Sequence, residues 1–398
     1  MNSRERVLTT LKHQEPDHVP FDLAGTNVSG IHIRAYKNLR VYLNMPECEP
    51  VFADVVQQIV IPDRDMMDRL QIDTRGLFPR TSSNWNITNQ DMGNRWRYVD
   101  EWGLVLEFPK EDGYWYSLVK SPIDAAETTV DAILNHPWPT PDNPERLEGL
   151  REQAIAFREE GRVVILKGFC AGLVEMGERI RGMENFLCDV LVAPDVVEAI
   201  LDKVLDLKLR FWDMALDAVG DLIDIVHEAD DFGTQESQLI SPEKYRELVK
   251  PREKELFGFL RKKLDATKTP GEERYILFHS CGNIRPLLPD FIELGVDIIN
   301  PVHTTVPEME PHALKRDFGA DLTFWGGGVD TQGILPSGTP DQVRENVRQN
   351  IEALAPGGGY VFNTIHNIQG EVPPENIMAM WETLQAVGGR QWAVGGRQ

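Results

Sequence analysis

The chain has 398 residues, with 41 Lys and Arg against 63 Asp and Glu, so its formal net charge is −22. This charge repels the phosphate backbone of nucleic acids, and we therefore expect no nucleic-acid partner. No segment resembles a signal peptide or approaches the roughly 18 apolar residues of a membrane helix. Four cysteines are too few for a disulfide framework in so long a chain. These observations predict a cytoplasmic protein with no membrane contact.

Short apolar segments alternate along the chain with amphipathic helical stretches, which is the pattern of a parallel sheet covered by helices. Eight strands are expected, at residues 19–24, 71–77, 162–169, 222–227, 275–279, 296–301, 322–326 and 360–363. The helices between them have N-terminal signals, such as Pro-Asp at the start of 194–219 and the capping residues Ser241 and Thr339, each followed by Pro. Eight strands predict an α/β fold of the (β/α)8 TIM-barrel type.

Aromatic and β-branched residues alternate with turn residues within residues 84–120. This pattern predicts an antiparallel β meander inserted after the second strand, suited to a lid or an oligomer contact. A single barrel domain is therefore expected over residues 1–385. The last six residues of the chain repeat residues 386–391, so we expect residues 386–398 to form a mobile tail rather than a folded repeat.

An imidazole and a thiol lie two residues apart where the fifth expected strand ends, at His279 and Cys281. In extended backbone, side chains two residues apart point to the same side. Zinc prefers this combination of nitrogen and sulfur ligands, so the pair is a candidate metal site. The alternative is a buried strand end, in which Cys281 serves as a small apolar residue.

Barrel enzymes assemble their sites from residues that follow the C-terminal ends of the strands. Polar residues of this kind are Glu228, Asp230, Asp231, Asn283, His303, Asp330 and His366. Asp230 and Asp231 suit catalysis or substrate orientation, and they equally suit the capping of a loop or helix. Asp330 equally suits stabilisation of its own turn, and Gly327 lies in a glycine run expected to pack closely on a ligand. His227 is expected inside a strand, with its hydrogen bonds satisfied.

Four segments carry a family resemblance. They are Asp230-Asp-Phe-Gly-Thr-Gln235, Phe278-His-Ser-Cys-Gly-Asn283, Phe324-Trp-Gly-Gly-Gly-Val-Asp330 and Tyr360-Val-Phe-Asn-Thr-Ile-His366. In these motifs the chain resembles the uroporphyrinogen decarboxylase superfamily over nearly its whole length. The resemblance implies a (β/α)8 barrel and one of two activities, because members are either porphyrinogen decarboxylases or zinc-dependent methyltransferases that work with corrinoid proteins.

Two features separate these branches. Decarboxylases of the superfamily carry an arginine-rich segment after the first strand, whereas residues 21–28 here contain an aspartate and no arginine, which disfavours a polycarboxylate tetrapyrrole. The methyltransferases are marked by His-x-Cys and by a third ligand, usually cysteine, after the eighth strand. His279 and Cys281 match the first two positions. His366 occupies the third, where decarboxylases also have a histidine without a metal.

The resemblance to the methyltransferase branch implies a Zn2+ ion held by His279, Cys281 and His366. A methyl group would move between a small methyl donor or thiol and a corrinoid (methylcobalamin) on a partner protein. The candidate catalytic residues are then Glu228, Asp230 and Asp231, and the candidate substrate-binding residues are Asn283, His303, Asp330 and Gly327.

Two alternatives to a methyltransferase remain open at this point. One is a decarboxylase of a small carboxylate that uses Asp230 or Asp231 without a metal. The other is a non-catalytic barrel that binds a tetrapyrrole or a corrinoid. The family is also compatible with a homodimer.

Overall fold

The computed structural model describes residues 1–81 and 88–389. In these residues the main sheet has seven parallel strands, arranged in space in the order β14-β13-β12-β11-β10-β9-β4. The strands are β4 (Thr74–Leu77), β9 (Val163–Lys167), β10 (Ile225–Ala229), β11 (Tyr275–His279), β12 (Ile298–Asn300), β13 (Thr323–Trp325) and β14 (Tyr360–Val361). Each overlaps a segment expected to be a strand, and β11 has the expected bounds.

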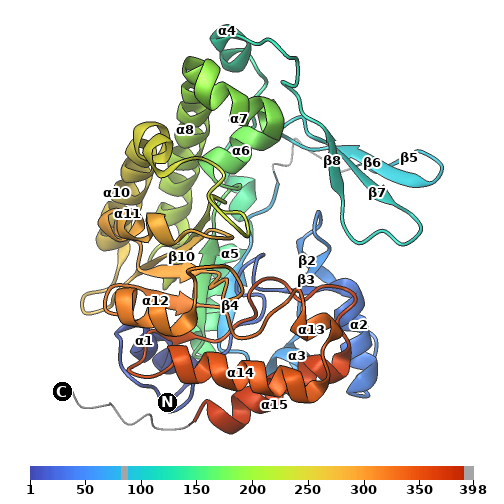
Figure 1. The fold of residues 1–398 in the computed structure, drawn as a ribbon, viewed down its shortest axis with the longest axis vertical. Coiled ribbons are helices and arrows are strands. Elements are labelled where there is room, and N and C mark those ends of the chain that lie inside the picture. The colour runs from blue at the N-terminus through green and yellow to red at the C-terminus, as the bar shows by residue number, and fades with distance from the viewer. Residues whose placement is uncertain (82–87, 390–398) are drawn as a thin grey trace.

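Helices alternate with these strands and surround the sheet (Figure 1). The α-helices are α1 (Ser3–Leu11), α2 (Ile33–Tyr42), α3 (Arg64–Arg69), α4 (Val130–Leu134), α5 (Leu150–Glu159), α6 (Leu173–Arg181), α7 (Met183–Val192), α8 (Pro194–Val219), α9 (Pro242–Lys244), α10 (Lys250–Thr267), α11 (Leu288–Glu293), α12 (Pro311–Phe318), α13 (Ile334–Ser337), α14 (Pro340–Leu354) and α15 (Pro374–Val387). Their N-terminal signals act as predicted. The side chain of Ser241 accepts the N–H of Lys244 in α9, and Thr339 forms a capping box with Gln342 in α14.

The segment around Phe21 lies between the two edge strands of the parallel sheet. The N–H of Phe362 donates to the carbonyl oxygen of Pro20 at 2.8 Å, and the N–H of Asp73 donates to the carbonyl oxygen of Phe21 at 2.9 Å. The predicted strand 19–24 is reduced to one bridge here, because Pro20 has no amide hydrogen with which to extend the ladder. The whole arrangement is compatible with the expected (β/α)8 barrel.

Side chains of the parallel strands alternate between two hydrophobic cores. Ile225 and Leu277 belong to a smaller core on the inner face of the sheet, which also includes residues of α1. Val226 belongs to the larger core between the sheet and the helices. Because direction alternates along a strand, His227 faces inward with Ile225, and Glu228 faces outward with Val226. This alternation decides which polar residues reach the site.

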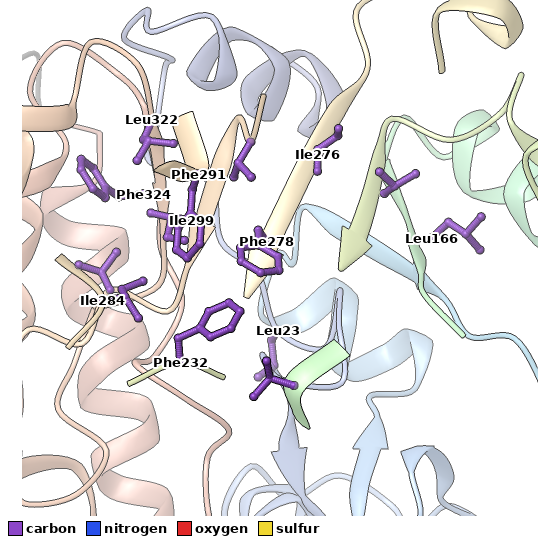
Figure 2. Packing of buried hydrophobic residues seen from close by; sticks show 14 of the residues in the cluster. Leu23, Leu166, Phe232, Ile276, Phe278, Ile284, Phe291, Ile299, Leu322 and Phe324 are labelled. Atoms are coloured by element: carbon purple, nitrogen blue, oxygen red, sulfur yellow. The ribbon is translucent and has the colours of Figure 1, made fainter. Parts of the chain in front are cut away.

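The larger core contains an aromatic cluster next to the end of β11, which Figure 2 shows from close by. The ring centroid of Phe278 lies 5.0 Å from that of Phe291 and 6.4 Å from that of Phe232. Such pairs contribute beyond the apolar area that they bury. They fix the outer side of β11, whose inner side carries His279.

Two antiparallel sheets lie beside the parallel sheet. The first has the order β1-β3-β2 and the second the order β5-β6-β7-β8. Their strands are β1 (Ile31–His32), β2 (Val51–Asp54), β3 (Ile59–Ile61), β5 (Gln90–Asp91), β6 (Arg95–Val99), β7 (Val105–Pro109) and β8 (Ser117–Lys120). The second sheet follows β4 in sequence and projects from the body of the molecule (Figure 1). Its connection to the first is fixed by the N–H of Tyr116, which donates to the carbonyl oxygen of Val56 at 2.8 Å.

The C-terminal helix continues beyond the predicted end of the domain. Val387 is buried at the end of α15, and the carbonyl oxygen of Gly388 accepts the N–H of Val19 at 2.8 Å. Residues 386–389 therefore belong to the folded part, and residues 390–398 of the predicted tail lie outside the described residues. None of the helices in the described ranges combines the length and apolarity needed to cross a bilayer.

Candidate metal centre and substrate cavity

Three potential metal ligands converge at the C-terminal end of β11. The Sγ atom of Cys281 lies 3.3 Å from Nε2 of His279. One ligand atom from each of His279, Cys281 and His366 lies within 4.8 Å of the others. Ligand atoms of a tetrahedral zinc site are about 2.0–2.3 Å from the metal, and hence roughly 3.3–3.8 Å from one another. Small side-chain movements bring the three donors to that spacing.

His366 reaches this cluster because its loop is tied to the N-terminal segment on both sides. The side-chain nitrogen Nδ2 of Asn363 donates to the backbone carbonyl oxygen of Asp22 at 2.9 Å. The side-chain oxygen of Asn367 accepts the N–H of Gly30 at 2.6 Å. These bonds fix the loop after β14, so the imidazole of His366 is held over the end of β11.

His279 is oriented by a buried amide. Oδ1 of Asn300 lies 2.5 Å from Nδ1 of His279, and Nδ2 of Asn300 donates to the carbonyl oxygen of Trp325 at 2.8 Å. The bond from Nδ2 to Trp325 fixes the orientation of the Asn300 amide, so its oxygen faces the imidazole. Because that oxygen is an acceptor, Nδ1 of His279 carries the proton. Nε2 is then the atom with a free lone pair, and it faces Cys281.

Asp231 lies against two of the donors, Cys281 and His279. Its Oδ1 accepts the N–H of Cys281 at 2.9 Å and is 3.6 Å from Nε2 of His279. The backbone of Cys281 is therefore anchored by a carboxylate that also adds negative charge beside the donors. This is an environment that favours a cation.

Burial sets the protonation of the donors. Desolvation raises the pKa of the Cys281 thiol well above its ordinary value, and the neighbouring Asp231 raises it further. Desolvation lowers the pKa of His366 to about 4, so its imidazole is the neutral form that ligates metals. A bound cation would stabilise the thiolate of Cys281 that burial disfavours. The donor set therefore fits zinc in the chemistry of its atoms and in their spacing.

Two of the donors, His279 and His366, line a cavity of about 340 Å³. Cys281 adjoins it through His279, whose Nε2 lies 3.3 Å from the Cys281 sulfur. This volume is at the lower end of the range for small-molecule sites. Residues from several segments line its wall: Asn27, Val28, Asp54, Gln57, Asp100, Trp102, Leu104, Lys167, Gly168, Cys170, Ala171, Glu175, Met176, Arg179, His227, Ala229 and Asp231. The turn between β6 and β7 contributes Asp100, Trp102 and Leu104. The inserted sheet is thus part of the cavity wall.

Comparison with known proteins places the chain in a family. Residues 100–387 match uroporphyrinogen decarboxylase (URO-D). The chain belongs to this family. The matched range includes the segments 230–235 and 278–283, on which the expectation from the sequence rested.

Two proteins of Methanosarcina mazei resemble the chain. Over 222 residues it is 27% identical to the methylated-thiol–coenzyme M methyltransferase, a match that covers 56% of this chain and 53% of that protein. The match thus spans about half the length of the relative. A solved methyltransferase structure superposes with a TM-score of 0.61 at 15% identity, covering 97% of this chain and 99% of the other, and shows that the fold is shared. These similarities are consistent with the methyltransferase branch of the family.

Two acids that the sequence suggested as catalytic do not face the cavity. Glu228 lies on the outer side of β10, where its carboxylate pairs with Lys208 of α8 at 2.5 Å, and both side chains are fully buried. Asp230 accepts the N–H groups of Val174 and Glu175, each at 2.9 Å, and so caps α6. The prediction was wrong for Glu228 because β10 continues to Ala229, two residues beyond its expected end, so alternation turns residue 228 outward. Of the three acids, Asp231 alone lines the cavity.

The four residues expected to bind substrate lie outside this cavity. Asp330 accepts the N–H groups of Gln332, Gly333 and Ile334, so its carboxylate stabilises its own turn. Gly327 has a φ of +72°, and a Cβ there would lie 2.7 Å from that of Val302, so the glycine serves backbone packing. Asn283 and His303 are buried in neighbouring loops without lining the cavity.

Several residues of the cavity were missed or misjudged from the sequence. Lys167 ends the otherwise apolar strand β9, and this lone cation in an apolar run was the available signal. His227 does lie inside its strand, but both of its ring nitrogens lack a hydrogen-bond partner among the described residues, so it is not satisfied as expected. Asp100 and Trp102 gave no signal, because only the tertiary fold brings the inserted sheet to the cavity.

Proposed function

We propose that this protein is a zinc-dependent methyltransferase that moves a methyl group between a small methyl donor or thiol and a corrinoid protein. The observation that supports the proposal most strongly is the convergence of His279, Cys281 and His366, two of which line the cavity. Three protein ligands with a free fourth position are typical of catalytic zinc sites. Family membership and the similarity to a methyltransferase support the same reaction class.

Each residue near the donors has a separate part in this proposal. Zinc, when bound, would lower the pKa of a substrate thiol or polarise the heteroatom of a methyl donor. Asn300 holds the His279 imidazole with Nε2 free for the metal. Asp231 anchors the backbone of Cys281 and orients groups that enter the fourth position. Trp102 forms an apolar part of the wall that limits the access of water.

The size of the cavity supports a separate corrinoid protein. A space of about 340 Å³ accommodates a small substrate and is too small for a corrin macrocycle with its side chains. The cobalt would therefore approach from the open end of the cavity, carried by a partner. The homodimer and the cytoplasmic location stay predictions.

Elemental analysis of the purified protein tests the metal site. We expect about one zinc per chain in the wild type and in Cys188→Ser, since Cys188 is an exposed free cysteine of α7. Cys281→Ser and His366→Ala should lose most of the zinc. Full zinc occupancy in both site variants would contradict the assignment of the ligands.

A methyl-transfer assay tests the reaction. With methylcobalamin and a panel of small thiols, the zinc-loaded wild type should demethylate the corrinoid, and Cys281→Ser should be slower by a factor of at least 100. Release of carbon dioxide from a small carboxylate by metal-free protein would instead support a decarboxylase. Corrinoid binding without turnover of any donor or thiol would support the non-catalytic alternative.

A further inference from the structure

The floor of the cavity carries two polar side chains from neighbouring strands. Lys167 of β9 and His227 of β10 are paired in register, and both line the cavity. In the same sheet, His279 is in register with Ala229, two residues further along β10. Two residues along a strand correspond to about 6–7 Å. Lys167 and His227 therefore lie one layer deeper than the metal ligands.

Lys167 has almost no partner among the described residues. Its Nζ donates to the carbonyl oxygen of the adjacent Gly168 at 3.2 Å, and no carboxylate of the described residues lies within ion-pairing distance of it. An ammonium group has three donors. The buried Lys208, by contrast, is paired with Glu228. Lys167 is thus a half-buried cation with unused donors at the cavity, and desolvation lowers its pKa.

His227 is also without a partner. Its side chain is buried, and within the described part of the chain neither Nδ1 nor Nε2 makes a hydrogen bond. Buried polar atoms are nearly always hydrogen-bonded in folded proteins. A neutral imidazole has one N–H donor and one acceptor. Its unused atoms point to a ligand at this level of the cavity.

Among the described residues, none of the four carboxylates that line the cavity wall forms an ion pair with Lys167, and each has a hydrogen-bond or ion-pair partner elsewhere; Asp231, for example, accepts the N–H of Cys281. Asp54 accepts the backbone N–H of Gln57 at 2.9 Å and its side-chain amide at 3.2 Å. Asp100 accepts two backbone N–H groups of its own turn. Glu175 pairs with Arg179. The ammonium group of Lys167 is therefore left without a directly bound carboxylate.

We propose that Lys167 and His227 form a subsite for an oxyanion, such as a carboxylate, at the far end of the small substrate. This inference rests on the proposed function for the position of the reacting atom, which lies at the metal one layer above. A molecule with a thiol or methylated heteroatom at one end and an oxyanion two or three carbons away spans this depth. The subsite selects substrates by their oxyanion, whereas the metal acts on the thiol or methylated heteroatom at the other end.

Binding measurements with two related thiols test the subsite in the zinc-loaded protein. 3-Mercaptopropanoate should bind at least tenfold more tightly than its uncharged amide, 3-mercaptopropanamide. Lys167→Met should remove this preference, and Lys167→Arg should restore part of it by keeping the charge. Lys262→Met, which removes an exposed lysine of α10, serves as the control for net charge and should behave as the wild type.

A probe without a thiol separates this inference from the proposed function. Propanoate should bind to metal-free protein, detected by ligand-observed NMR, and Lys167→Met should weaken that binding at least fivefold. His227→Phe, which removes both ring nitrogens, should also weaken it. If zinc is absent but propanoate binding depends on Lys167, the methyltransferase proposal fails and the subsite stands. Equal binding of the acid and the amide by the wild type, or unchanged propanoate binding in Lys167→Met, would overturn the subsite.

Discussion

The Oδ1 atom of Asn300 lies 2.5 Å from Nδ1 of His279, at the base of the candidate metal centre. The residues lie side by side in the sheet, since His279 of β11 is in register with Asn300 of β12. The amide is fixed in turn by Trp325, whose carbonyl oxygen accepts from Nδ2. One strand thus supplies the candidate ligand His279, and the neighbouring strand sets its tautomer.

This relationship predicts the effect of removing the amide. Asn300→Ala should weaken zinc binding by about 10–100-fold, because the imidazole loses the acceptor that holds Nε2 toward the metal. Competition with a zinc chelator measures the affinity. Asn376→Ala is a matched control, since Asn376 is equally buried and bonds to the carbonyl oxygens of Leu335 and Gly338 away from the site. Unchanged zinc affinity in Asn300→Ala would show that its role is confined to packing.

Asp230 should behave as a helix cap. Asp230→Ala leaves the N–H groups of Val174 and Glu175 without an acceptor at the start of α6, which should cost about 1–3 kcal/mol of unfolding free energy. Urea denaturation measures this loss. The folded variant should retain its zinc, because the carboxylate does not face the donors. Loss of zinc from the folded variant would show that Asp230 contributes to the metal site.

Glycine is required at position 327 for two reasons that a pair of variants separates. Gly327 and Gly357 both have positive φ, +72° and +77°, but only at Gly327 would a Cβ meet close neighbours. Gly357→Ala should therefore cost about 1 kcal/mol from backbone strain alone. Gly327→Ala should cost about 1–3 kcal/mol more, since its Cβ collides with Val302. Equal losses of unfolding free energy in the two variants, measured by urea denaturation, would argue against close packing at Gly327.

Glu253 predicts a pH dependence of stability. Desolvation raises the pKa of this fully buried carboxyl from its ordinary 4.5 to about 8. A raised pKa in the folded state gives a contribution to stability that is fully present below pH 4.5 and is lost as the pH rises toward 8, at about 1 kcal/mol per pH unit. Glu253→Gln keeps the acceptor for the hydroxyl of Tyr245 and should flatten this slope.

The measurement for Glu253 is urea denaturation at several pH values between 5 and 8. Glu255→Gln, an exposed position of the same helix, removes one carboxylate without touching the core and should retain the wild-type slope. Parallel slopes for all three proteins would show that the buried carboxyl is compensated by a group that titrates with it.

The sequence predicted the parts of the site that depend on local spacing. His279 and Cys281 were paired correctly because extended backbone places residues two apart on one side, and His366 was found by its position after the last strand. The prediction for Glu228 was wrong for a related geometric reason. The strand β10 is longer than expected, so Glu228 is a strand residue, and successive side chains of a strand point to opposite faces. Alternation from the buried Ile225 would have placed it outward.

Most residues of the cavity wall could not be predicted from local spacing in the sequence. Asp100 and Trp102 reach the cavity through the packing of the inserted sheet against the N-terminal segment, where Tyr116 bonds to Val56. Contacts between segments some 60 residues apart in the sequence have no local signature. Lys167 had such a signature, since a lysine at the end of an apolar strand is unusual, but His227, with which it is in register, lies on another strand.

The turn between β6 and β7 forms part of the cavity wall but supplies none of the candidate metal donors. The candidate metal donors lie at and after the ends of β11 and β14 in the parallel sheet, whereas Asp100, Trp102 and Leu104 come from a hairpin attached to it. Replacement of that hairpin can reshape the space for a new compound without disturbing the reacting centre.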